Sequence, residues 1–230
     1  MKTTLKLLTL FGLLSVTVML HASVTVGSFN TGNCYPFMCN DSGSNVGQSI
    51  DYQEAYVSTA FSGPLTVNTI SWFDYPLGPA VILGGSYTFY WGYSAVGLGL
   101  TGNFATNWVG GAGTLLGTAT VPAGGVNFGT VLTLSGFSPF TYNPTNGDLL
   151  MEIVVNNQDN VPNGSGNGFN WADSTTSQIA RAYCLDSGGC GGAGNGALVT
   201  SFNIPEPGSL VMFGSGLIGL AGIVRRKFNL

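Results

Sequence analysis

Short runs in which apolar residues occupy every second position limit most strongly what this chain can fold into. Aromatic residues alternate in this way from residue 87 to 93, and aliphatic residues do so from 149 to 155, with Glu152 on the opposite face. A period of two is that of one face of a β-strand. Between the two ends of the chain, no long stretch shows the 3.6-residue period of an amphipathic helix. The chain is therefore predicted to be all-β.

Turn residues separate the predicted strands, as in Ser62-Gly63-Pro64 and in residues 143–148. We expect about nine or ten strands, which for this length favours a single antiparallel β-sandwich, jelly-roll-like in its winding. The candidate strands are residues 24–29, 55–61, 65–73, 86–94, 115–121, 126–134, 149–155, 178–183 and 198–203.

Residues 1–22 have the layout of a secretory signal peptide. Lys2 and Lys6 precede the apolar residues 7–20, and the small Ala22 ends a cleavage site. The alternative is a buried N-terminal helix. Removal of residues 1–22 and of the chain from residue 205 onward leaves residues 23–204, a domain of 182 residues that is long enough to enclose one core.

The other end of the chain has three parts in a fixed order. Pro205-Glu206-Pro207 precedes the apolar residues 209–224, and the basic residues Arg225, Arg226 and Lys227 follow. A helix of 16 residues is about 24 Å long, shorter than the roughly 30 Å hydrocarbon core of a bilayer. It suits a transient anchor better than the alternative, a permanent one. The basic cluster should stay cytoplasmic, which places residues 23–204 outside.

This order of motif, apolar helix and basic stop resembles the PEP-CTERM sorting signal of bacteria that secrete exopolysaccharide. The resemblance covers residues 205–230. It implies an exosortase-like membrane enzyme as partner, which would cut near Pro205 to Pro207 after a transient stay in the inner membrane. Delivery to the cell surface or the extracellular matrix would follow. The exported domain itself resembles no specific named family.

The charges of residues 23–204 exclude several classes of partner. Arg181 is the one cation among them and nine carboxylates accompany it, so the net charge is −8. Nucleic acid needs several Lys or Arg residues to neutralise its phosphates, and anionic lipid headgroups need the same. We expect Arg181 to pair with one of the carboxylates.

The exported residues also lack the histidine and lysine side chains on which many enzyme mechanisms depend. The only histidine of the chain, His21, leaves with the signal peptide, and no lysine remains. Ser-His-Asp and Cys-His mechanisms, lysine Schiff bases and imidazole zinc sites are thereby excluded. We therefore expect no enzyme and no cofactor. A carboxylate pair such as Asp148 and Glu152 keeps a glycosidase as an alternative.

The four cysteines form two close pairs, Cys34 with Cys39 and Cys184 with Cys190. Export to an oxidising compartment favours disulfides, and the short Gly-rich and Ser-rich loops favour the two local bridges among the three pairings that four cysteines allow. A zinc site with four thiolates is the alternative.

Two tryptophans and two aspartates are the candidate ligand-binding residues. Trp108 and Trp171 lie in Gly-rich and Asn-rich segments where an aromatic side chain tends to be exposed, whereas Trp72 and Trp91 alternate within strands and are expected in the core. Asp159 and Asp173, with backbone carbonyl groups, are candidate calcium ligands.

Three functions fit these observations. The first is a non-enzymatic cell-surface or matrix protein associated with exopolysaccharide, and it needs no further assumption. The second is a carbohydrate-binding module that uses loop aromatics. The third is an exported glycosidase or polysaccharide lyase, which needs a carboxylate pair in a cleft. We take the first as the prediction and the second as its alternative.

Overall fold

The computed structural model describes residues 21–39, 48–76, 80–159, 169–185 and 189–205. Ser23–Ile204 forms one compact unit, and Met1–Ala22 with Pro205–Leu230 forms a second, which lies almost wholly outside the described residues. The predicted signal helix, the C-terminal hydrophobic helix and the residues Glu206, Pro207, Arg225, Arg226 and Lys227 therefore lie outside the described residues. None of the helices in the described part combines the length and the apolar character needed to cross a membrane.

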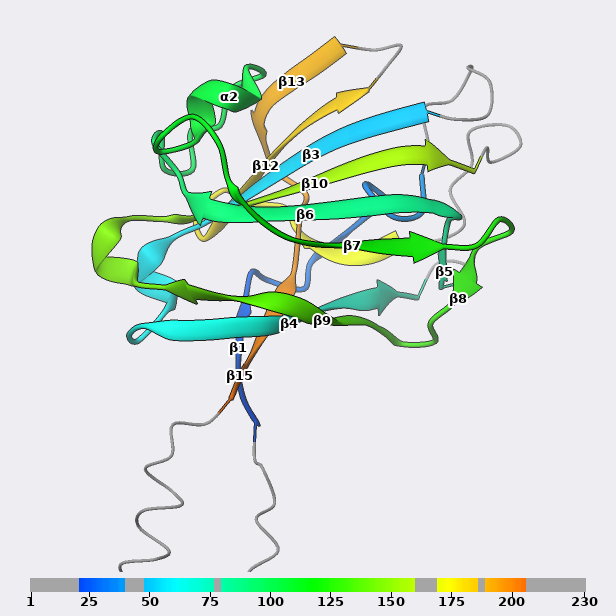
Figure 1. The fold of residues 1–230 in the computed structure, drawn as a ribbon, viewed down its shortest axis with the longest axis horizontal. Coiled ribbons are helices and arrows are strands. Elements are labelled where there is room, and N and C mark those ends of the chain that lie inside the picture. The colour runs from blue at the N-terminus through cyan, green and yellow to red at the C-terminus, as the bar shows by residue number, and fades with distance from the viewer. Residues whose placement is uncertain (1–20, 40–47, 77–79, 160–168, 186–188, 206–230) are drawn as a thin grey trace, which may run out of the picture. The chain divides into compact units, whose positions relative to one another are not determined.

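One layer of the fold is a six-stranded sheet (Figure 1), in which the strands follow one another from β13 to β7. Their bounds, in sheet order, are β13 Gly189–Gly194, β12 Ile179–Leu185, β3 Gln48–Tyr56, β10 Leu149–Gln158, β6 Gly85–Tyr93 and β7 Thr114–Val121. Tyr87, Phe89 and Trp91 of β6 are fully buried, as are the aliphatic residues at every second position of β10. The alternation in the sequence therefore marks the inner face of this sheet.

The second layer is a seven-stranded sheet with the path β1-β15-β4-β11-β14, to which β2 and β9 add by pairing with β11 and β4. The bounds are β1 His21–Val26, β2 Thr31–Asn33, β4 Leu65–Tyr75, β9 Val131–Tyr142, β11 Phe169–Asp173, β14 Ala197–Leu198 and β15 Thr200–Pro205. β5 Val81–Ile82 and β8 Val126–Asn127 form a separate pair, and three short helices are η1 Ser58–Ala60, α2 Phe104–Asn107 and η2 Pro144–Asn146.

The main hydrophobic core lies between the two sheets. Trp72 of β4 packs on Phe89 of β6 with ring centroids 6.2 Å apart, and Phe202 of β15 packs edge-on against Trp91 at 5.5 Å. Burial of such rings is a main source of folding free energy, since each removes about 150–250 Å² from water. The prediction of Trp72 and Trp91 as core residues is confirmed, because both are fully buried.

The predicted fold class is confirmed: every strand pair with a described register is antiparallel, and the strands form a sandwich. The described residues contain fifteen strands rather than the nine or ten expected, because several short strands were missed, and the predicted strand 198–203 spans β14 and β15. Two other predicted strands also differ from the structure. Residues 55–61 lie mostly beyond β3, whose earlier part was missed because Gln53 and Glu54 are polar although both are fully buried. The predicted strand 126–134 is two strands, because the chain turns at Gly129, where φ is +72° and glycine is favoured.

Candidate functional site

The outer face of the six-stranded sheet carries a row of side chains that converge on one carboxylate. Glu152 of β10 lies opposite Gln53 of β3 on one side and opposite Tyr90 of β6 on the other, and Tyr90 lies opposite Leu115 of β7. Residues directly opposite in an antiparallel pair point to the same face. The four strands therefore bring together side chains that are far apart in the sequence.

Asp51 joins this row from the neighbouring position of β3 on the same face and hydrogen-bonds with Glu152. Burial, and then the neighbouring Glu152 carboxylate, raises the pKa of Asp51 from 3.8 to about 7. A neighbouring negative charge favours the protonated form of Asp51, since two adjacent negative charges repel. Glu152 also accepts hydrogen bonds from Gln53 Nε2 and from Trp108 Nε1, the latter at 2.9 Å.

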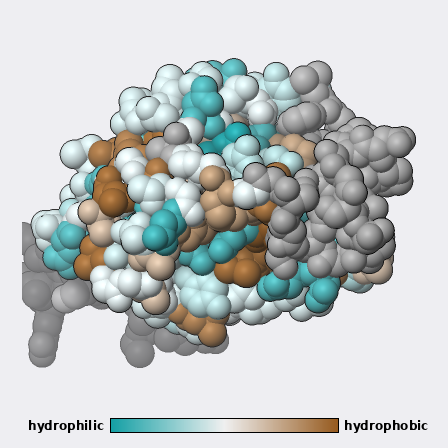
Figure 2. Space-filling view, turned by 90° about the horizontal axis from the view of Figure 1, so that it is seen from above, coloured by the Kyte–Doolittle hydropathy of each residue, from teal (hydrophilic) through white to brown (hydrophobic). Residues whose placement is uncertain are grey.

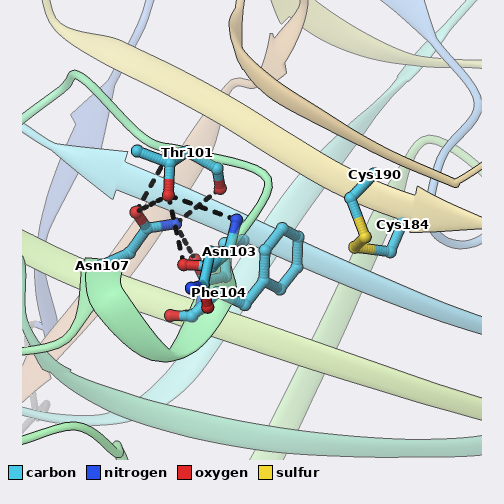
Figure 3. Close-up of a disulfide and its surroundings, with 7 residues drawn as sticks. Thr101, Asn103, Phe104, Asn107, Cys184 and Cys190 are labelled. Atoms are coloured by element: carbon cyan, nitrogen blue, oxygen red, sulfur yellow. Dashed lines mark hydrogen bonds between the residues drawn. A yellow bond between two sulfur atoms is a disulfide. The ribbon is translucent and has the colours of Figure 1, made fainter.

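A loop that contains α2 is fixed over this face by a buried amide network. Asn107 Nδ2 donates to Gln53 Oε1 at 2.7 Å and to the Thr101 carbonyl at 2.9 Å, while Asn107 Oδ1 accepts from the Thr101 amide at 2.9 Å. Figure 3 shows Asn107 and Thr101 of this network beside the Cys184–Cys190 disulfide, which joins β12 to β13. A second, smaller hydrophobic cluster lies beneath the loop, made of Ala55, Leu100, Phe104, Trp108, Leu150 and Ala182.

The predicted exposure of Trp108 is wrong, because its side chain is only 6% exposed. The indole occupies a slot between Gly92 and Gly113, where a Cβ built at Gly113 would lie 2.7 Å from Trp108 Cη2. Any larger residue at these two positions would compete with the ring for space. The Gly-rich sequence that suggested an open loop instead provides the space into which the ring packs.

A pocket of about 280 Å³ opens between this loop and the sheet. It is lined by Asp51, Tyr90, Phe104, Ala105, Trp108, Gly111, Ala112, Gly113 and Glu152. The side of the molecule that carries α2 and β13 is shown in Figure 2, where hydrophobic and hydrophilic residues are interspersed. The pocket thus offers two carboxyl groups and aromatic walls to a small ligand.

The carboxylate pairs of this face do not have the spacing that glycosidases use. Asp51 and Glu152 touch, which leaves no room for a sugar or a water between them. Asp148 precedes Glu152 by four positions at the start of an extended strand, which places their Cα atoms about 13 Å apart. Asp148 Oδ1 instead accepts a hydrogen bond from the Ser58 amide at 2.7 Å, so it supports a turn.

Trp171 belongs to a separate aromatic cluster with residues from three other positions of the chain. Its ring lies 4.5 Å from that of Tyr75 and 5.9 Å from that of Phe29, and Phe29 lies 5.1 Å from Phe73. Phe29 is 48% exposed, and the other three rings are partly exposed. We call Phe29, Phe73, Tyr75 and Trp171 the aromatic cluster. The structure thus places Trp108 and Trp171 in two different settings.

The candidate calcium ligands Asp159 and Asp173 hold backbone amides. Asp159 Oδ2 accepts from the amides of Gly84 and Gly124, at 3.1 and 2.7 Å. Asp173 binds the amides of Ser28 and Thr175, both at 2.8 Å; burial opposes its charge, but these hydrogen bonds lower the pKa of Asp173 below its ordinary value. Within the described ranges, no group of three His, Cys, Asp or Glu residues is placed to hold a metal ion.

The remaining predicted side chains are structural. Both local disulfides, Cys34–Cys39 and Cys184–Cys190, are present as predicted. Arg181 differs from the expectation of a carboxylate partner: it donates to Asn33 Oδ1 and to the Asn195 carbonyl, both at 2.9 Å, and lies over the ring of Tyr183. Arg181 lies in β12, and its guanidinium reaches Asn195, which directly follows β13.

Sequence reasoning missed Asp51, Gln53, Tyr90 and Asn107 as site residues. The available signal was the alternation of polar residues in β3, because Asp51 and Gln53 share one face of that strand. No spacing in the sequence shows that Glu152, 99 positions after Gln53, lies beside it.

Comparisons with known proteins concern the C-terminal segment. No curated protein and no solved structure matches the chain. The family model described as the PEP-CTERM protein-sorting motif matches residues 203–227, which include Pro205-Glu206-Pro207 and the basic residues predicted to follow the apolar stretch. The chain therefore carries a PEP-CTERM sorting motif, which implies export and sorting toward the cell surface by an exosortase-type system.

Proposed function

We propose that residues 23–204 are a non-enzymatic cell-surface or matrix protein, released by an exosortase-like enzyme and associated with exopolysaccharide. The observation that carries the proposal is the sorting motif at residues 203–227, which begins within the last strand, β15. The destination of such a motif is the cell exterior, so the cargo acts there. The inner membrane holds the precursor only until it is cut.

The chemistry of the cargo supports a role without catalysis. Residues 23–204 contain neither histidine nor lysine, and their one cation, Arg181, is hydrogen-bonded to Asn33 and to the Asn195 carbonyl. The contacting carboxyl groups of Asp51 and Glu152 do not have the separation that glycoside hydrolysis needs. Two disulfides suit a protein that functions in an oxidising environment.

Replacement of Pro205, Glu206 and Pro207 by alanine tests the sorting step. We expect the triple variant to accumulate as precursor in the inner membrane, because the processing enzyme no longer recognises its substrate. Pro122→Ala, in an exposed turn of the sandwich, is the matched control and should be processed normally. Surface delivery of the triple variant at the wild-type level would refute the proposed sorting step.

Carbohydrate binding is the second candidate function, and the aromatic cluster around Trp171 favours it. Its four rings gather on one side of the seven-stranded sheet with partial exposure, and sugar rings pack well on exposed aromatic faces. A glycan array on residues 21–205, with and without chelator, tests binding and any requirement for calcium. We expect Trp171→Ala to abolish the signal and Val126→Ala, at an exposed position of β8, to leave it unchanged. Silence on every glycan would count against this candidate.

A further inference from the structure

The pocket beside Trp108 concentrates negative charge without a balancing cation. Asp51 and Glu152 both line it, and none of its lining residues is basic. The one cation of residues 23–204, Arg181, is held by Asn33 and the Asn195 carbonyl instead. A ligand with a positive charge would therefore meet two carboxyl groups at a partly buried position, where the attraction is stronger than in water.

One oxygen of this pair also lacks a hydrogen-bond donor. Asp51 Oδ1 is buried and accepts no hydrogen bond in the described structure, whereas Glu152 Oε2 accepts from both Gln53 and Trp108. A buried acceptor without a donor is costly, and because Asp51 Oδ1 is itself closed to solvent, a positive charge nearby in the pocket would stabilise it through space. An ammonium group supplies this charge.

The aromatic walls support an organic cation rather than a metal ion. Tyr90 and Trp108 line the pocket next to the carboxyl groups, and aromatic rings attract ammonium groups. Calcium needs about six to eight oxygen ligands, whereas only two carboxyl groups line this pocket. The volume of about 280 Å³ lies just below the range of roughly 300–1,000 Å³ that holds drug-sized ligands, so it suits a small molecule or one unit of a polymer.

We propose that the pocket formed by Asp51, Glu152, Tyr90 and Trp108 binds the protonated amine of a small ligand, either an amino sugar or an aliphatic amine. The ammonium group donates to the carboxyl groups of Asp51 and Glu152 where they line the pocket. Glu152 keeps its hydrogen bond from Trp108, so the ligand binds without a rearrangement of these two side chains. This binding site is independent of the aromatic cluster around Trp171.

The indole N–H of Trp108 provides a direct readout, because it donates to Glu152 at 2.9 Å. Residues 21–205 include every described strand and the compact unit Ser23–Ile204 with its own core, so this fragment retains the fold. With ¹⁵N-labelled tryptophan, we expect glucosamine or cadaverine to shift the Trp108 indole resonance saturably. The Trp72 and Trp91 resonances, from rings in the main core, should not move.

A comparison of three ligands separates the contribution of the ammonium charge to binding from that of the sugar ring. N-acetylglucosamine keeps the ring of glucosamine but lacks the ammonium group, so it should bind at least about tenfold more weakly, the loss of a charge-assisted hydrogen bond. A shift with glucosamine alone identifies an amino sugar, and a shift with cadaverine as well identifies a more general amine site. Equal binding of N-acetylglucosamine, or no shift with either amine, would overturn the proposal.

Asp51→Asn tests the protein side with little change of shape. We expect it to weaken binding of the amine by about tenfold or more, since the charge is removed and the Trp108 anchor is kept. Asp74→Asn, which changes the net charge equally on the other sheet, is the control and should bind as the wild type does. Wild-type affinity in Asp51→Asn, with an unchanged near-ultraviolet circular dichroism spectrum, would contradict the assignment.

Discussion

Glu54 is an acid buried in the main core, and its ionisation should control stability near neutral pH. The side chain is fully buried and accepts hydrogen bonds from Tyr52 Oη at 2.8 Å and from the Leu198 amide at 3.1 Å. Burial nevertheless raises the pKa of Glu54 from 4.5 to about 7, because the donors only partly replace the lost water. The folded state therefore holds the proton more tightly than the unfolded chain does.

The sign and the size of the effect follow from this difference. A raised pKa in the folded state stabilises the fold fully below pH 4.5, and this contribution is lost as the pH rises through about 7. At about 1.4 kcal/mol for each pKa unit, the loss amounts to about 3 kcal/mol. Asp51, which is more exposed, changes stability in the same direction. Glu54 therefore contributes more stability at pH 4 than at pH 8.

Glu54→Gln keeps the shape of the side chain and removes its titration. We expect the free energy of unfolding of residues 21–205, from urea denaturation with the disulfides intact, to depend less on pH in this variant. The change between pH 4 and pH 8 should shrink by about 3 kcal/mol relative to wild type. Asp51→Asn provides the comparison for the other acid. If Glu54→Gln retained the full wild-type pH dependence, the reasoning would be refuted.

Three further substitutions test the loop over the outer face. Asn107→Ala removes four side-chain hydrogen bonds, one of them fully buried, and should lower the free energy of unfolding by about 2 kcal/mol, with faster amide exchange in the loop. Gly113→Val places a side chain where the ring of Trp108 lies, so tryptophan fluorescence should shift to the red; an unchanged spectrum would contradict the slot. Replacing both Cys184 and Cys190 by alanine should cost about 2 kcal/mol in urea, as expected for a short bridged loop, and no loss would argue against the bridge.

The core was predictable where the alternation of the sequence was purely apolar. In residues 87–91 and 149–155, every second side chain is large and hydrophobic, which predicts the inner face of the strand. All of these alternating side chains are buried. Strand β3 was not predictable in the same way. Its inner face includes Glu54 and its outer face Gln53, both fully buried through hydrogen bonds that no periodicity reveals.

The pocket depends on strand register, which the sequence does not state. Asp51 and Glu152 meet only because β3 and β10 pair with Gln53 opposite Glu152. A shift of one residue would turn each of these side chains to the other face. Trp108, predicted as a possible ligand-binding residue, lines the pocket, but its burial depends on Gly92 in a strand and on Gly113 in a segment that the sequence suggested was an open loop.

The most direct test of the account is the mass of the protein recovered from the cell surface. Both hydrophobic ends are interpreted as targeting signals that are removed by cleavage. The surface form should therefore begin near Ser23 and end near Pro205 to Pro207, with both disulfides formed. Intact-mass spectrometry with sequencing of both termini measures this in one sample. A surface form that retains Arg225, Arg226 and Lys227 would contradict the account.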